Sequence, residues 1–138
     1  MDKYETLHVG QASNPVQITV TPEWALAYRE ATGYVTTPQH HDGHPVAPPM
    51  MMALLGRMSM TWIPVAPGAV HAKQSYRFHR PILIGEMLSV QSSIVHRFEK
   101  RGKSYLVIGV RATDSRGALV GEGETTRVAP FTNGGPTR

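Results

Sequence analysis

The sequence predicts an α+β domain in which an antiparallel sheet wraps around one long central helix. Residues 50–63 are apolar on nearly every side, which is typical of a helix that is buried all round. Four segments after this helix alternate between apolar and polar residues, as half-buried strands do. Short turn sequences separate the four segments, so we expect them to form an antiparallel meander.

Length and composition set the bounds of this prediction. The 138 residues suit a single domain at residues 14–129, preceded by a loose arm at 1–13 and followed by a tail at 130–138. The chain has no cysteine, which excludes disulfides, thiolate metal ligands and a cysteine nucleophile. The first residues are charged and lack the apolar stretch of a signal peptide, so we expect a cytoplasmic protein.

Charge and hydrophobicity also restrict the partners. The net charge of +4 favours an anionic partner, such as a phosphate-bearing group or an acidic protein. Nucleic acid is not expected, because the chain has neither a basic run nor a recognition motif. A membrane is not expected either, because the apolar segment 50–63 is too short to span a bilayer and contains Arg57.

The first half of the domain should supply one short strand and two helices. Residues 16–20 alternate between apolar and polar side chains and predict the strand. Thr21 is typical of a helix N-cap, and Gly33 is typical of the residue that ends a helix. Residues 34–45 form a polar loop rich in histidine, after which two prolines introduce the central helix.

The second half should supply the four strands, at residues 70–79, 87–98, 104–113 and 119–128. In the first of them we expect one buried face, formed by Val70, Ala72, Tyr76 and Phe78. In the second, the alternation breaks between Ile94 and Val95, which predicts a β-bulge. Gly102 is typical of a tight hairpin turn between the second and third strands.

Several short motifs follow one another in a specific order. They are Ala31-Thr32-Gly33, Pro38-Gln39-His40-His41-Asp42, Val46-Ala47-Pro48-Pro49-Met50, Gly85-Glu86-Met87-Leu88 and Thr113-Asp114. With the order of the elements, they resemble the hot-dog fold and, within it, the MaoC-like hydratases and dehydratases. They are most similar to the branch that resembles the dehydratase domain of fungal fatty-acid synthase. The resemblance covers residues 14–128.

This resemblance implies a function. Family members add or remove water at 2-enoyl or 3-hydroxyacyl thioesters of CoA or acyl carrier protein. They need no cofactor beyond the CoA or phosphopantetheine that the substrate carries. The resemblance also implies a homodimer, or a heterodimer with a second hot-dog chain.

The family holds the water with an Asp and a His in the pattern Asp-x-Asn-Pro-x-His. His40 falls on the family histidine, so we expect it to act as the general base. The place of the aspartate falls on Val35 or, with one extra residue after Gly33, on Tyr34. Tyr34 and Asp42 are therefore the other catalytic candidates, Tyr34 as a hydrogen-bond donor and Asp42 as a substitute carboxylate. Packing is the alternative for each.

A second departure from the family concerns substrate binding. The family usually has a glycine whose backbone N–H binds the thioester carbonyl, and here Pro49 takes its place and has no N–H. The helix could still offer the amides that follow Pro49. The candidate substrate-binding residues are Pro49, Met50, Met51, His41, Arg77 and Arg80. A metal site is not expected, because adjacent histidines rarely converge on one ion and the family uses none.

The preferred prediction is a MaoC-like acyl-thioester hydratase or dehydratase. The alternative is a non-catalytic acyl-binding subunit of a heteromeric dehydratase, because both the carboxylate and the glycine amide are missing. The motif Ala47-Pro48-Pro49 also resembles such a partner subunit. Altered chemistry on the same scaffold stays open. A thioesterase is disfavoured, because residues 50–63 contain no carboxylate.

Overall fold

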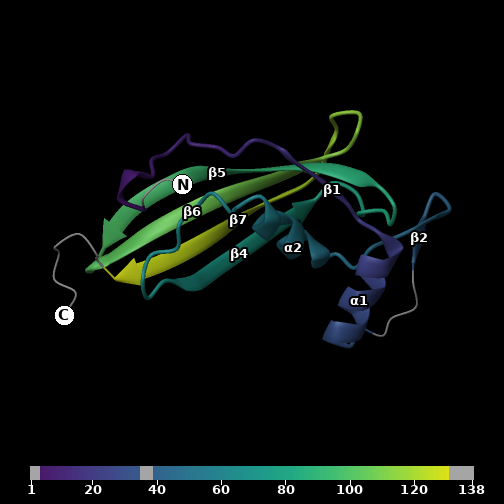
Figure 1. The fold of residues 1–138 in the computed structure, drawn as a ribbon, viewed down its shortest axis with the longest axis horizontal. Helices are drawn as coiled ribbons and strands as arrows, with labels where there is room; N and C mark the ends of the chain where they lie inside the picture. The colour runs from purple at the N-terminus through teal and green to yellow at the C-terminus, as the bar shows by residue number, and fades with distance from the viewer. Residues whose placement is uncertain (1–3, 35–38, 131–138) are drawn as a thin grey trace.

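The structure is a computed structural model that describes residues 4–34 and 39–130 (Figure 1). Its elements, in chain order, are the 3₁₀ turn η1 (Tyr4–Thr6), β1 (Val16–Thr19), α1 (Pro22–Thr32), β2 (His40–His41), β3 (His44–Pro45), α2 (Met51–Met58), β4 (Val70–Phe78), β5 (Met87–Lys100), β6 (Lys103–Thr113) and β7 (Leu119–Pro130).

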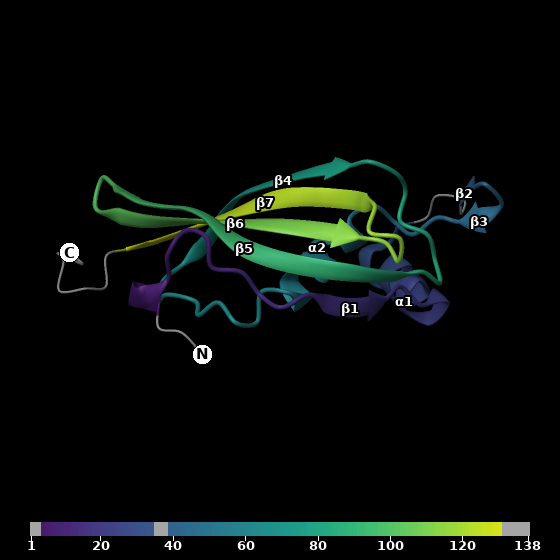
Figure 2. The ribbon, with the colours of Figure 1, turned by 90° about the horizontal axis from the view of Figure 1, so that it is seen from above.

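Five antiparallel strands form one curved sheet in the order β1-β5-β6-β7-β4, and α2 lies against one of its faces (Figures 1 and 2). Alternate residues of β5 and β6 point toward α2 and are buried: Leu88, Val90, Ile94, Leu106, Ile108 and Val110. On the helix, Met51, Met52 and Leu55 are fully buried against them. The predicted α+β domain with a sheet around one helix is therefore confirmed.

Only three of the four predicted strands form a meander. β5, β6 and β7 pair in sequence, but β4 pairs with β7, in a register that runs from Val70 opposite Val128 to Phe78 opposite Gly121. The free side of β5 pairs with β1 instead. The four-stranded meander is therefore wrong, because alternation sets which face of a strand is buried but not which strand lies beside it.

β4 is an edge strand and has no fully buried face. Val70 is 59% exposed and Phe78 is 38% exposed, and Tyr76 is the only residue of β4 that is not exposed. The register shifts between His71 and Lys73, so the sequence alternation does not continue through the strand. The predicted buried face of this strand is therefore wrong, except at Tyr76.

The central helix is shorter than predicted and ends at Met58 rather than at Ile63. The Ser59 hydroxyl donates to the carbonyl of Gly56 at 2.7 Å, and this hydrogen bond closes the last turn. Ile63 is nevertheless buried, through a turn in which its amide donates to the carbonyl of Met60. The apolar run after Met58 therefore reflects burial without helix.

Residues 4–13 were expected as a loose arm, but they lie along β5. Leu7 is 3% exposed, and the amides of Gly10 and Ser13 donate to the carbonyls of Ile94 and Ser92. Beyond Pro130 the predicted tail lies outside the described residues. The boundaries at residues 14 and 129 stay a prediction.

The local signals of the sequence are confirmed. Thr21 caps α1 by accepting a hydrogen bond from the amide of Trp24 at 3.1 Å, and Gly33 ends the helix with φ of 68°. The bulge in β5 lies between Ile94 and His96. Gly102 has φ of 74° in the hairpin turn. Within the described residues, no helix is long and apolar enough to cross a membrane.

Candidate functional site

Residues 40–45 of the histidine-rich loop fold into a short hairpin, β2–β3, at the end of the molecule where α1 lies (Figures 1 and 2). Asp42 and Gly43 form its turn with φ of 51° and 78°, the left-handed values that an Asp-Gly pair favours. The hairpin is anchored to the segment between β4 and β5, because the amide of Ile84 donates to the carbonyl of Pro45 at 2.9 Å.

The structure leaves His40 exposed on this hairpin. In the described part of the chain its imidazole makes no hydrogen bond and no ion pair with a carboxylate. His41 Nε2 lies 3.6 Å from Asp42 Oδ2, but the Asp42 side chain is 89% exposed. An exposed pair of neighbouring side chains orients an imidazole only weakly. His40, His41 and Asp42 are therefore close in the chain, but no histidine among them is firmly oriented by the carboxylate.

Tyr34 and Pro49 are brought together. They line a small cavity of about 60 Å³ between the end of α1 and the start of α2. The guanidinium carbon of Arg29 lies 5.2 Å from the centre of the Tyr34 ring. The ring is thus held at the cavity by a cation–π contact. Val35, the other place for the family aspartate, lies outside the described residues.

The start of α2 has fewer free backbone N–H groups for a thioester carbonyl than the sequence predicts. The amides of Met51 and Met52 donate to the carbonyls of Pro48 and Pro49 at 3.0 and 3.1 Å. The Met51 side chain is fully buried, so it packs in the core and does not face a ligand. Met50 is 49% exposed, and its amide has no acceptor among the described residues. Met50 is therefore the one methionine of the predicted pair that a ligand can reach.

Arg80 is tied into a salt-bridge network. Its guanidinium binds both oxygens of Glu86, at 2.7 and 2.9 Å, and Asp114 Oδ2 at 3.2 Å. The hydrogen bond to Glu86 raises the pKa of Arg80, and the amide of Ala118 is the main reason why the pKa of Asp114 lies below its usual range. Arg80 shares a cavity of about 380 Å³ with His41 and Asp42. It is not a free cation there, because two carboxylates already neutralise it.

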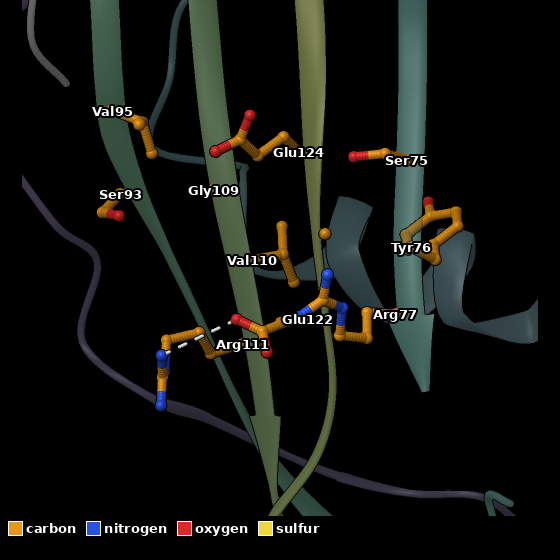
Figure 3. Close-up of a pocket in the computed structure, with 11 residues that line it drawn as sticks. Ser75, Tyr76, Arg77, Ser93, Val95, Gly109, Val110, Arg111, Glu122 and Glu124 are labelled. Carbon is orange, nitrogen blue, oxygen red and sulfur yellow. Dashed lines mark ion pairs between the residues drawn. The ribbon is translucent and has the colours of Figure 1, made fainter. Parts of the chain in front are cut away.

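Arg77 lies on the other face of the sheet. Gly109 and Arg111 alternate with the buried Ile108 and Val110, so they point away from α2. Together with Arg77 they line a polar depression of about 440 Å³ (Figure 3). Arg77 and Arg80, predicted together as substrate-binding residues, are therefore not brought to one site.

Two features of the structure were missed in the sequence. The first is a histidine–carboxylate pair between β7 and the residue that follows β4: His79 Nε2 lies 2.8 Å from Glu122 Oε2. This hydrogen bond is the main reason why the pKa of Glu122 is lowered. Glu122 also faces the polar depression in Figure 3, where Arg111 lies 3.9 Å away. Local patterns do not show this pair, because its members are 43 positions apart.

The second missed feature is a groove of about 450 Å³ beside α2, which contains Arg57 and Arg127. The strand alternation indicates which way the Arg127 side chain points. Arg127 lies two residues from both Thr125 and Ala129, which are buried, so it faces the same side of the sheet as they do. A metal site finds no support in the described ranges, where no three histidine or acidic side chains gather.

The comparisons with known proteins concern the whole domain. Residues 7–122 match the family described as FAS1-like, dehydratase domain region. A search of curated protein sequences finds no match.

Three solved structures are similar. The (R)-hydratase PhaJ1 from Pseudomonas aeruginosa shares 23% identity, with 94% of this chain and 86% of that chain covered and a TM-score of 0.72. The (R)-hydratase from A. caviae shares 20%, covering 91% and 99%, with a TM-score of 0.73. The HadBC (3R)-hydroxyacyl-ACP dehydratase complex from Mycobacterium tuberculosis shares 22%, covering 88% and 96%, with a TM-score of 0.69. These similarities confirm the predicted hot-dog fold.

Proposed function

Because the chain belongs to the family of FAS1-like dehydratase domain regions, we propose that it is the acyl-binding subunit of an acyl-thioester hydratase or dehydratase. In this proposal it holds a 2-enoyl or 3-hydroxyacyl thioester of CoA or acyl carrier protein together with a second hot-dog chain. The second chain supplies the carboxylate and the histidine that hold the water. The thioester carries the only cofactor group.

The observation that supports this proposal is the state of the catalytic positions. Within the described residues the exposed His40 imidazole has no carboxylate to orient it, and proton transfer depends on such positioning. The amides of Met51 and Met52 are occupied by the carbonyls of Pro48 and Pro49. A thioester carbonyl needs free donors at the place where negative charge develops. The chain therefore keeps the fold of a hydratase and His40, but without a carboxylate that orients His40 among the described residues.

A second chain also suits the edge of the sheet. β4 pairs with β7 on one side only, and its free edge carries exposed side chains such as Val70. Such an edge is normally covered by another strand or chain. The similar HadBC structure is, by its description, a complex of dehydratase subunits. By analogy with it we place the partner beside this hot-dog domain.

A hydratase that works alone is the second candidate. Its support is His40, which stands in the motif position of the family histidine and is exposed on the hairpin. The free amide of Met50 could then bind the thioester carbonyl. An imidazole can move a proton near neutral pH without a carboxylate, although less efficiently than an oriented one.

Titration with enoyl thioesters separates the two candidates. The purified chain is mixed with crotonyl-CoA and longer 2-enoyl-CoA, alone and with a co-expressed MaoC-like chain that has an intact Asp-x-Asn-Pro-x-His pattern. We expect binding without hydration for the chain alone, and hydration only with the partner. In the complex, His40→Ala should change turnover by less than about tenfold, as should the control His44→Ala.

Hydration by the chain alone, reduced roughly 10²–10⁴-fold by His40→Ala and not by His44→Ala, would instead establish the second candidate. Neither binding nor hydration with any CoA or carrier-protein thioester would remove both candidates.

A further inference from the structure

The groove beside α2 is lined by apolar side chains and by two arginines. Leu54 of α2, Val65 of the following segment and Val70 of β4 are among the apolar lining residues. Arg57 at the end of α2 and Arg127 of β7 line the same groove. Its volume of about 450 Å³ lies within the range of small-molecule sites, roughly 300–1,000 Å³. The groove is therefore large enough for an amphipathic ligand.

Among the described residues Arg127 has no partner for its charge. Its Nη1 atom is buried and makes no hydrogen bond there, and its Nη2 atom donates to the sulfur of Met60 at 3.9 Å. Among the described residues no carboxylate lies within ion-pair distance of Arg127 or Arg57. Burial and then the nearby charge of Arg57 lower the pKa of Arg127. Two like charges thus share a groove whose described lining residues include no carboxylate.

Two other polar side chains of the groove do have partners. Thr125 donates to the side chain of Gln74 at 2.7 Å, and Gln74 donates to the carbonyl of Glu124 at 3.0 Å. A half-buried guanidinium without a counter-charge costs stability, whereas an apolar side chain at this inward position of β7 would not. The free chain therefore does not benefit from Arg127, and the deficit fits an anion that comes from outside.

We propose that this groove binds an aliphatic chain that ends in an oxyanion, either a carboxylate or a phosphate. The oxyanion lies between Arg127 and Arg57, and the aliphatic part lies against Leu54 and Val65. Arginine suits this role, because its planar donors bind carboxylate and phosphate in a bidentate manner.

The source of the oxyanion rests on the function proposed above. If a thioester carbonyl is held near the amide of Met50, α2 carries the acyl chain about 10 Å along its axis to Arg57. The oxyanion would then be a carboxylate at the far end of the acyl group. If the thioester enters from the opposite end of the groove, the oxyanion would be the phosphate of phosphopantetheine.

Calorimetric titration tests the inference without any thioester. The purified chain is titrated with octanoate, octyl phosphate and the neutral octanol, which share one aliphatic chain. We expect the two anions to bind at least about tenfold more tightly than octanol. Arg127→Met should remove this preference and leave octanol binding unchanged, whereas Arg127→Lys should retain part of it. The control Arg111→Met, on the opposite face of the sheet, should change nothing.

Two further ligands identify the source of the oxyanion. The first is 4′-phosphopantetheine, and the second is the monothioester that octanedioic acid forms with a neutral thiol. The ligand that binds more weakly to Arg127→Met than to the wild type shows whether the groove takes the phosphate or the carboxylate. Equal binding of octanoate and octanol, or no binding of either, would overturn the inference. If the anions bind but no acyl thioester does, the inference stands and the proposed function fails.

Stability gives an independent readout. Without ligand, Arg127→Met should raise the melting temperature by about 3–5 °C, because it removes an unpaired half-buried cation. A lower melting temperature would show that Arg127 is a structural residue and would overturn the inference. A self-association that Arg127→Met weakens, with no anion bound, would show that a partner chain fills the groove and would overturn it equally.

Discussion

Arg77 and Arg80 are three positions apart, yet their partners give them different roles. Arg80 is surrounded by Glu86 and Asp114, whereas Arg77 lines the open polar depression on the other face of the sheet. A cation with two carboxylates is a structural residue, because neither carboxylate can lose its counter-charge without cost. A cation on an open surface contributes little to stability.

These two arginines give a matched prediction. Arg80→Met should lower the free energy of unfolding by about 1–3 kcal/mol, because it removes the guanidinium that binds both Glu86 and Asp114. Arg77→Met should change it by less than about 0.5 kcal/mol. Urea denaturation of both variants measures the difference. Equal values for the two would mean that the network around Arg80 does not stabilise the domain.

At the scale of elements, α2 shows how a helix can be buried on one face and open on another. Leu55 is fully buried under the sheet, whereas its neighbour Leu54 is partly exposed and lines the groove. The sequence, apolar at both positions, did not distinguish them. The groove exists because α2 turns Leu54 toward β4 rather than toward the core.

Aspartate substitutions at these two positions should have opposite outcomes. Leu55→Asp should abolish folding, since an unpaired carboxylate in the core costs several kcal/mol against a total stability of roughly 5–15 kcal/mol. Leu54→Asp should fold with a modestly lower melting temperature, because its carboxylate can reach water. Circular dichroism during heating distinguishes them. A folded Leu55→Asp variant would contradict the position of α2 in the core.

In β7, a glycine that is unfavourable for a strand makes room for a side chain of the neighbouring strand β4. Gly121 and Gly123 are poor strand residues by propensity. In the structure the ring of Tyr76 lies over Gly123, where a Cβ atom would meet the ring and the carbonyl of Ser75. Gly123 therefore gives Tyr76 its place, which makes Tyr76 the one residue of β4 that is not exposed.

At the scale of the whole molecule, acidic side chains tie distant segments together. Asp114 and Glu122 have pKa values below the ordinary 3.8 and 4.5, Asp114 mainly through the amide of Ala118 and Glu122 mainly through His79. A carboxyl group with a lowered pKa in the folded state contributes stability above its ordinary pKa. This contribution is lost as the pH falls through the folded pKa.

The domain should therefore lose stability in acid. We expect the free energy of unfolding to decrease below about pH 4.5 and to keep falling below pH 3.8. The Asp114→Asn variant should be less stable than the wild type at pH 7. Its free energy of unfolding should decrease less steeply than that of the wild type between about pH 4.5 and pH 2. Urea denaturation at a series of pH values measures the slope. An unchanged slope would show that Asp114 does not carry the effect.

The open edge of β4 predicts the state of the chain in solution. We expect light scattering at micromolar concentration to give at least twice the mass of one chain, either for the chain alone or for its complex with the hot-dog partner, because an unpaired edge strand favours association. A stable monomer that does not bind the co-expressed partner would contradict this expectation.

The sequence by itself determined the two helices and the five strands of the large sheet, but not η1 or the β2–β3 hairpin. The strands, the caps of α1, the bulge in β5 and the hairpin turn at Gly102 follow from residues within a few positions of one another, where alternation and turn chemistry act. The resemblance in its motifs also predicted the fold. The end of α2 was missed, because an apolar run continues into a buried turn and hydrophobicity alone does not separate the two.

Only the tertiary structure decided which strand lies beside β4 and which charges have partners. Arg80 meets Asp114 across 34 positions, and Arg127 meets Met60 across 67. Local patterns carry no information about such contacts, because they depend on the sheet order β1-β5-β6-β7-β4. For the same reason the sequence placed Arg77 and Arg80 in one site and passed over Arg57 and Arg127, the two cations that share a groove.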